Sequence, residues 1–206
     1  TVNSNKKRIN RNKNILEVLN GQERFKGKVA AVTSWDVFPY ILNEERNKLP
    51  VNSGYEMIDE PAMTGTQQMT NMVQQTAIAE KEDTRYDLLT FVTAKEYIKK
   101  HEPKVMYISL GETDEWAHHG RYDLYLQQAN QLDKYIGDLW YYVQTNEFYK
   151  NKTAFVITTD HGRGYINAGS WIKHGPFTPG SKEIWMAMMG PGIKAAGEIK
   201  EESQLL

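Results

Sequence analysis

The sequence contains no cysteine, and this absence restricts both its covalent stabilisation and its metal sites. Without thiols the chain can form neither a disulfide bond nor a thiolate zinc site. Histidine, aspartate and glutamate are then the strong ligands left for a transition metal. There are only five histidines, so their positions are informative.

An excess of charge of either sign is also missing. The 25 Lys and Arg residues nearly balance the 26 Asp and Glu residues, which gives a formal net charge of −1. The net charge is therefore too small to attract a nucleic acid polymer or an acidic membrane surface electrostatically. An anion handled by this protein must be held by local groups.

Long apolar runs are absent as well. No run reaches the roughly 18 residues that a membrane-spanning helix needs, and Thr1 begins a polar stretch rather than a signal peptide. Asn, Lys and Arg dominate residues 1–14, which indicates a surface arm with little to bury. The 206 residues are 40% hydrophobic and can bury one core, so we expect a single domain over residues 1–206.

Short apolar runs alternate with longer amphipathic segments along the chain. The runs predict strands over residues 28–34, 105–110, 153–159 and 183–189. The other segments predict helices over 15–19, 35–47, 67–80, 84–100 and about 125–143, with a loop over 49–65. Strands separated by helices favour parallel pairing through right-handed crossovers. The expected fold class is α/β, a three-layer sandwich with a mostly parallel central sheet and helices on both faces.

Three of the histidines lie in or near loops that follow predicted strands, where open α/β sheets place their sites. Asp114 and His118 are four residues apart at a helix entrance, so one turn would aim both side chains the same way. Asp160 and His161 directly follow a predicted strand, and His174 lies in the loop before the last strand. Three imidazoles and two carboxylates suit zinc or manganese and suit calcium poorly.

Each of these motifs alone has a simpler structural explanation. An Asp and a His four residues apart commonly pair on a helix surface, and an Asp at a strand end commonly caps a turn. His174 alone would be an ordinary loop histidine. Their joint occurrence favours a metal site. The neighbouring His119 is expected to point about 100° away from His118. It should therefore be exposed to solvent or contact a metal ligand without binding the metal itself.

The order of the motifs resembles the alkaline phosphatase superfamily over residues 104–197. An Asp-x-x-x-His motif starts at Asp114, an Asp-His-Gly motif follows an apolar strand at Asp160, and a His-Gly pair follows at His174. The superfamily includes phosphatases, nucleotide phosphodiesterases, phosphonate hydrolases, cofactor-independent phosphoglycerate mutases and sulfatases. The ordered set is far more specific than any one motif.

The resemblance implies a two-metal hydrolase of small phosphate esters, in which two divalent ions stabilise the attacking and leaving oxygens. Zinc is expected, and manganese is the alternative. By the resemblance, Asp114, His118 and His174 correspond to the ligands of one ion, and Asp160 and His161 to ligands of the second.

Two cations next to these positions could bind the substrate. Arg163 and Lys173 are neighbours in sequence of candidate ligands and are candidates to bind the non-bridging oxygens of the ester. The equally simple alternative is that both are solvated surface cations.

The superfamily also uses an upstream Asp ligand and a Ser or Thr nucleophile, and neither has a matching motif here. We therefore expect the nucleophile upstream of Thr1, in a chain truncated there and at residues 204–206, and inactive alone. Three hydroxyls inside the chain are the alternatives to an upstream nucleophile. Ser34 is better explained as a helix cap, and Thr64 and Thr66 lie in a loop without a partner motif.

Several functions stay open from sequence. A phosphatase or phosphodiesterase is favoured; a sulfatase is disfavoured because sulfatases typically hold calcium with oxygen-rich ligands. A mutase is disfavoured because the chain lacks room for an inserted domain. The alternative of another class is a non-catalytic metal-binding module. Similar proteins are often exported, so a periplasmic or secreted location is expected, with a cytoplasmic location as the alternative. The leaving group and the oligomeric state are not indicated.

Overall fold

The computed structural model describes residues 5–77 and 83–199, which form two compact units. Unit 1 is Thr1–Tyr135 and unit 2 is Ile136–Leu206, and the boundary falls inside the long helix α7 (Tyr122–Thr145). Within the described residues, no helix combines the length and the apolar character needed to cross a membrane.

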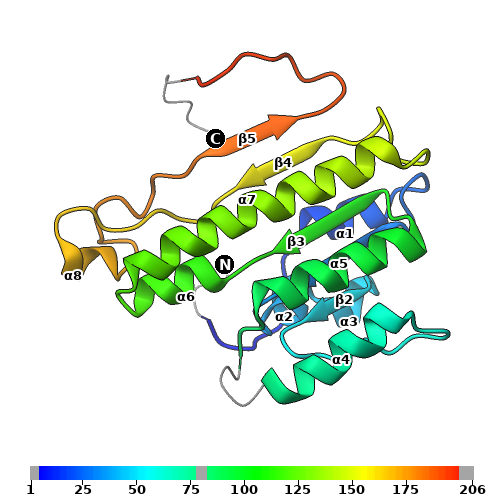
Figure 1. Cartoon of the computed structure of the whole chain (residues 1–206), viewed down its shortest axis with the longest axis horizontal. Helices are drawn as coiled ribbons and strands as arrows, with labels where there is room; N and C mark the ends of the chain where they lie inside the picture. The colour runs from blue at the N-terminus through cyan, green and yellow to red at the C-terminus, as the bar shows by residue number, and fades with distance from the viewer. Residues whose placement is uncertain (1–4, 78–82, 200–206) are drawn as a thin grey trace. The chain divides into compact units, whose positions relative to one another are not determined.

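Unit 1 contains a parallel three-stranded sheet in the order β2-β1-β3. Figure 1 shows α5 beside β3 of this sheet. The strands are β1 (Val29–Thr33), β2 (Val51–Ser53) and β3 (Val105–Ser109). Every residue of β1 is buried, as expected for a continuous apolar run at the centre of a parallel sheet. The carboxyl ends of all three strands lie at one edge, because the last residue of β1 pairs with the last residues of β2 and β3.

Helices pack on both faces of this sheet. The helices of unit 1 are α1 (Ile15–Asn20), α2 (Phe38–Leu42), α3 (Glu44–Asn47), α4 (Gly65–Ala77), α5 (Asp87–His101), α6 (Glu112–His118) and the first part of α7. Val29 and Ala31 of β1 share a core cluster with Leu16 of α1 and Leu42 of α2. Alternation along the strand turns the intervening residues to the other face, and α5 also contacts β1 and β3. The α/β layered fold class expected from the sequence is confirmed.

Three local predictions in unit 1 were wrong. Strand β2 lies inside the segment expected to be a loop, and its three residues are too short a run to give a periodic signal. The helix expected over 35–47 is divided in two, because Asn43 adopts a left-handed conformation with a φ of 54°. Ser34 does not cap it, since α2 begins after Val37. The helix expected over 67–80 is described only to Ala77; residues 78–80 lie outside the described part.

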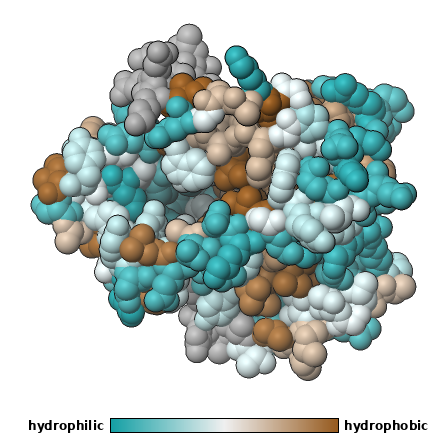
Figure 2. Space-filling view, turned by 45° about the horizontal axis from the view of Figure 1, so that its top comes forward, coloured by the Kyte–Doolittle hydropathy of each residue, from teal (hydrophilic) through white to brown (hydrophobic). Residues whose placement is uncertain are grey.

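Helix α4 buries polar side chains and exposes apolar ones. Its buried polar residues are Gln67, Thr70 and Gln74, and its exposed apolar residues are Met69, Met72 and Val73. The amide oxygen of Gln74 accepts a hydrogen bond from Arg85 at 3.0 Å, and its amide nitrogen donates to the carbonyl oxygen of Glu56 at 3.4 Å. Side-chain hydrogen bonds thus orient α4. Figure 2 shows hydrophobic residues, in brown, among hydrophilic ones at the surface.

Unit 2 contains an antiparallel pair of strands, β4 (Phe155–Thr158) and β5 (Met186–Met189), and the four-residue helix α8 (Ala168–Trp171). The parallel pairing expected for these strands was wrong. Their long connection holds only α8, so it supplies no crossover helix and the chain returns in the opposite direction. The second part of α7 packs on β4 through Trp140, whose ring meets that of Phe155 edge-on at 5.3 Å.

The half-buried carboxylate of Glu60 links the 59–64 segment of unit 1 to the end of α5 by hydrogen bonds. Glu60 binds Nε2 of His101 at 2.6 Å and Nζ of Lys100 at 3.1 Å, and Gln67 donates to it as well. Burial would raise the pKa of Glu60, but the hydrogen bonds from Gln67, Lys100 and His101 outweigh it and lower the pKa. The fold therefore favours the ionised form.

Replacement of Glu60 by Gln should flatten the acid limb of the stability curve. A carboxyl group with a lowered pKa stabilises the fold above its unfolded pKa and loses that contribution as the pH falls through its folded pKa. The wild type should thus lose roughly 1–2 kcal/mol between about pH 5 and pH 3 that Glu60→Gln does not lose. Urea denaturation across this range tests the prediction. Asp59→Asn, at an exposed neighbouring position, should retain the wild-type slope.

Candidate metal site

The candidate ligands of unit 1 lie on α6, directly beyond the carboxyl end of β3. Oδ2 of Asp114 lies 3.3 Å from Nε2 of His118, so one turn of α6 brings the two side chains together as the spacing predicted. Both side chains are partly solvent-exposed, at 38% and 43%. An accessible carboxylate beside an imidazole is a suitable donor pair for a divalent ion.

His119 takes no part in this pair. Its Nδ1 lies 2.7 Å from the carbonyl oxygen of Glu115, and its ring lies 6.4 Å from that of Trp116. The adjacent histidine is therefore exposed and turned to its own helix end.

The candidate ligands of unit 2 lie beyond the carboxyl end of β4. Oδ1 of Asp160 accepts a hydrogen bond from the backbone nitrogen of His161 at 3.0 Å, and the Asp160 side chain is 89% exposed. Nδ1 of His161 lies 2.9 Å from the carbonyl oxygen of Gly162. A carbonyl oxygen can only accept, so Nδ1 carries the proton and Nε2 carries the lone pair that a metal requires.

His174 lies against His161 within unit 2. The two imidazole rings stack with centroids 3.8 Å apart and an angle of 11° between their planes. Two-metal sites hold their ions about 4 Å apart, so parallel rings at this spacing can each serve a different ion. Sequence alone placed these histidines in two separate loops, and the structure brings them together.

Close backbone packing joins these two loops. The backbone nitrogen of Gly162 donates to the carbonyl oxygen of Ser181 at 3.0 Å, and that of Gly175 donates to Oγ of Ser181 at 3.0 Å. A Cβ atom on Gly162 would collide with the carbonyl oxygens of Gly180 and Glu183. Glycine is therefore required at position 162 for this loop to pack against residues 180–183.

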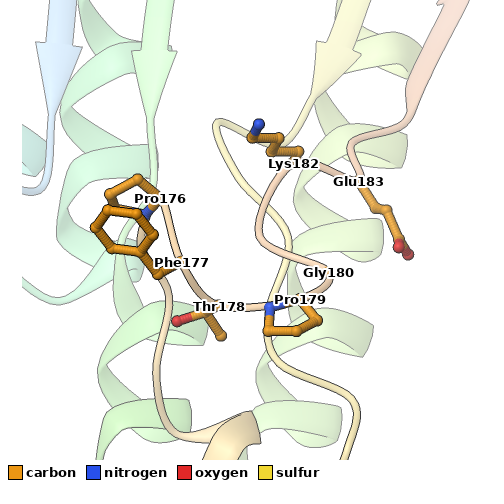
Figure 3. Close-up of a pocket in the computed structure, with 7 residues that line it drawn as sticks. All are labelled: Pro176, Phe177, Thr178, Pro179, Gly180, Lys182 and Glu183. Atoms are coloured by element: carbon orange, nitrogen blue, oxygen red, sulfur yellow. The ribbon is translucent and has the colours of Figure 1, made fainter.

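The loop after His174 encloses a surface hollow (Figure 3). Its lining residues are Pro176, Phe177, Thr178, Pro179, Gly180, Lys182 and Glu183. Pro176 and Phe177 lie on one side, and Lys182 and Glu183 lie on the other. Phe177 is 97% exposed, so this loop presents an aromatic ring three residues after His174.

The family model of type I phosphodiesterase / nucleotide pyrophosphatase matches residues 3–202. The chain belongs to this family. The family is a member of the alkaline phosphatase superfamily, so the resemblance seen in the order of the motifs is confirmed. No curated protein and no solved structure matches the chain.

Two of the three candidate nucleophilic hydroxyls of this phosphodiesterase-family chain have structural roles. Ser34 is fully buried and its Oγ donates to Oδ1 of Asp87 at 2.7 Å. Thr64 and Gln67 form a capping box at the start of α4: Oγ1 of Thr64 accepts from the backbone nitrogen of Gln67, and Oε1 of Gln67 accepts from that of Thr64. Thr66 is exposed in the first turn of α4. Thr64 also donates from Oγ1 to Oε2 of Glu96 at 2.8 Å. Both acceptor carboxylates hold other structural hydrogen bonds, Asp87 with the backbone of Gly111 and Glu96 with Lys99.

The two candidate substrate-binding cations of the phosphodiesterase-family chain lie in unit 2. Arg163 donates from NH1 to the carbonyl oxygen of Trp171 at 3.2 Å, and its guanidinium carbon lies 6.0 Å from the centre of the Trp171 ring. Lys173 is exposed, and its carbonyl oxygen accepts from the backbone nitrogen of Gly164 at 3.3 Å. The Arg163 guanidinium is thus held against Trp171, whereas Lys173 is exposed to solvent.

Sequence reasoning missed a group of buried polar residues close to α6. Asp87 and Glu112 are buried, at 0% and 7% exposure, and Gln128 of α7 donates to both, at 3.0 Å and 3.4 Å. The only sequence signal is an acidic residue at the first position of a helix, which ordinarily indicates a local cap.

Alanine at position 162 should destabilise unit 2 and disturb the ligands beside it. The added Cβ forces the 160–164 segment away from residues 180–183, at a cost of about 1–3 kcal/mol. Gly137→Ala is the matched control, because a Cβ there meets nothing within 4 Å. It should be neutral or stabilising by about 0.5–1 kcal/mol, since it lies within α7. Thermal unfolding measures both, and equal stability of the two variants would contradict the close approach.

Proposed function

We propose that this chain is a metal-dependent hydrolase of small phosphoric esters that uses two divalent ions, zinc or alternatively manganese. Family membership supports the hydrolase activity in general. The metal dependence, the number of ions and their ligands are the proposed part. The proposal assigns Asp114, His118 and His174 to one ion and Asp160 and His161 to the other.

The stacked imidazoles of unit 2 are the observation that carries the proposal. His161 and His174 approach to 3.8 Å, and the carbonyl oxygen of Gly162 directs the lone pair of His161 to Nε2. A structural pair of core histidines would be buried, whereas these two are only half-buried and stand beside an exposed Asp160 carboxylate. Together they offer nitrogen and oxygen donors, the mixture that zinc prefers.

Unit 1 supplies a second donor pair of the same chemistry. The carboxylate of Asp114 and the imidazole of His118 lie on one turn of a helix that follows a strand. This is the position where open α/β sheets place their catalytic groups.

The proposed chemistry follows from the charge that these groups can hold. Asp114, His118, His174, Asp160 and His161 would hold two divalent ions, which would supply charge stabilisation for the attacking and leaving oxygens of an in-line displacement at phosphorus. Arg163 and Lys173 would attract the anionic ester. Phosphodiester and pyrophosphate linkages are the proposed targets, in keeping with the family description. No group among the described residues is assigned as the nucleophile.

Zinc binding by ligand variants tests the assignment. Three protein ligands are enough for one tight zinc, whereas two should bind the second ion weakly. The wild type should thus retain about one equivalent after dialysis, and His118→Ala and His174→Ala should each weaken that affinity by more than about 100-fold. His119→Ala is the matched control and should bind zinc as the wild type does.

Hydrolysis of chromogenic esters tests the reaction class. Because no nucleophile is assigned among the described residues, the turnover of this chain alone should be low. Any turnover should favour a phosphodiester over a phosphomonoester and a sulfate ester, and chelation should abolish it. Zinc binding with turnover that has no preference for phosphoric esters would favour the non-catalytic metal-binding module. Loss of zinc from His119→Ala equal to that from His118→Ala, or turnover that survives chelation, would overturn the proposal.

A further inference from the structure

The helix that carries Asp114 and His118 lacks a cap of its own. Its N-cap residue is Gly111, which has no side chain to accept hydrogen bonds from the first turn. The carboxylate of Asp87, the first residue of α5, takes this role. Oδ1 of Asp87 accepts from the backbone nitrogen of Gly111 at 2.7 Å, and Oδ2 accepts from that of Glu112 at 3.0 Å.

The capping is reciprocal between the two helices. Oε2 of Glu112, the first residue of α6, accepts from the backbone nitrogen of Asp87 at 2.7 Å. Each helix therefore receives its cap from the first residue of the other. This is the pattern of a capping box, here formed across 25 residues of sequence. The starts of α5 and α6 are fixed to one another as a result.

Two further side chains hold the Asp87 carboxylate in place. Oγ of Ser34, which follows β1, donates to Oδ1 at 2.7 Å, and Nε2 of Gln128 on α7 donates to Oδ2 at 3.0 Å. Burial raises the pKa of Asp87, although the hydrogen bonds from Gly111, Ser34, Glu112 and Gln128 oppose it. Two of these four donors are backbone N–H groups that cannot become acceptors, so the site accommodates an asparagine amide poorly.

Helix α6 depends on this cap more than a long helix would. It has only seven residues, and few internal hydrogen bonds define its axis. Asp114 lies two positions after Glu112, within the first turn. A loss of the cap would therefore let the two ligand side chains leave their common geometry.

We propose that Asp87 is a positioning residue that fixes α6 so that Asp114 and His118 meet their metal ion in a single geometry. The inference rests on the proposed function. Gln128 and Glu112 act in the same direction through their contacts with Asp87 and with the start of α6. Residues that orient metal ligands typically change metal affinity by about 10- to 100-fold when they are replaced.

Cobalt binding by the full chain tests the inference. Co²⁺ substitutes for zinc, and its visible absorption reports the ligand geometry. Asp87→Asn should weaken Zn²⁺ affinity by about 10- to 100-fold and alter the shape of the Co²⁺ spectrum. Gln128→Met retains the volume of the side chain and should change the Zn²⁺ affinity and the Co²⁺ spectrum in the same direction, but by less. It replaces Asp87→Asn in the test if that variant does not fold.

A stability-matched control separates positioning from a merely structural role. Leu49→Ala removes a side chain from the core cluster that Leu49 forms with Val29 of β1 and Leu16 of α1. At a temperature well below the unfolding midpoints of Asp87→Asn and Leu49→Ala, the Leu49→Ala variant should keep the wild-type metal affinity and Co²⁺ spectrum. Amide exchange of residues 112–118 should accelerate in Asp87→Asn and not in Leu49→Ala.

The outcomes distinguish the inference from the function on which it rests. If the wild type binds no Co²⁺ or Zn²⁺, or if His118→Ala binds as the wild type does, the proposed function and this inference both fall. If His118→Ala loses the metal while Asp87→Asn and Gln128→Met behave as Leu49→Ala does, only the positioning role is overturned.

Discussion

Two buried charges that need complete sets of hydrogen-bond partners determine how unit 1 is assembled. Arg85 and Asp87 are both 0% exposed and lie two residues apart. Burial lowers the pKa of Arg85 to about 10, so the guanidinium is still charged at neutral pH. An unpaired buried charge would cost several kcal/mol, so the chain around both groups is arranged to supply partners. Through its hydrogen bonds, the Asp87 carboxylate at the start of α5 connects the end of β1, the start of α6 and α7.

The Arg85 guanidinium likewise connects β1, β2 and α4 through hydrogen bonds. It donates to the carbonyl oxygen of Thr33 in β1, to Oδ1 of Asn52 in β2 and to Oε1 of Gln74 in α4. The need to satisfy the guanidinium explains why α4 turns its polar side inward. It also explains why a three-residue edge strand has a defined place, since Asn52 is one of the acceptors. The segment 85–87 thus sets the geometry beside the candidate ligands of α6.

The sequence could predict those features that depend on local periodicity. The apolar runs that became β1, β3, β4 and β5 are continuous enough to be recognised, and the stripe along α7 has helical spacing. The face of α4 could not be predicted, because its exposed methionines are the residues that periodicity assigns to a core. The antiparallel pairing of β4 and β5 depends on a long connection whose course leaves no periodic pattern. Asn43 breaks a helix through a φ of 54° that several residue types could adopt at a small cost.

The candidate ligands were recognisable for a different reason. His, Asp and Gly residues directly beyond apolar runs are unusual enough to stand out one motif at a time, and the stacking of His161 on His174 follows once their loops pack together. Asp87 gave no such signal, because its partners Gly111 and Gln128 lie 24 and 41 residues away in sequence. Long-range hydrogen bonds of this kind become visible only in the folded chain.

The two donor sets are held by different physical means, and this difference bears on the cost of binding an ion. In unit 1, Asp114 and His118 lie on a short helix whose start is fixed by a buried carboxylate. In unit 2, His161 is oriented by the carbonyl oxygen of Gly162, and the segment around it is packed against residues 180–183 because position 162 has no Cβ. Side chains that are already oriented lose little conformational entropy when a metal binds, so more of the ligand–metal interaction remains as affinity. Asp160, at 89% exposure, is the exception, because its carboxylate must still be ordered when the ion arrives. The second proposed ion has fewer protein ligands and also bears this entropy cost. We therefore expect it to bind more weakly than the first.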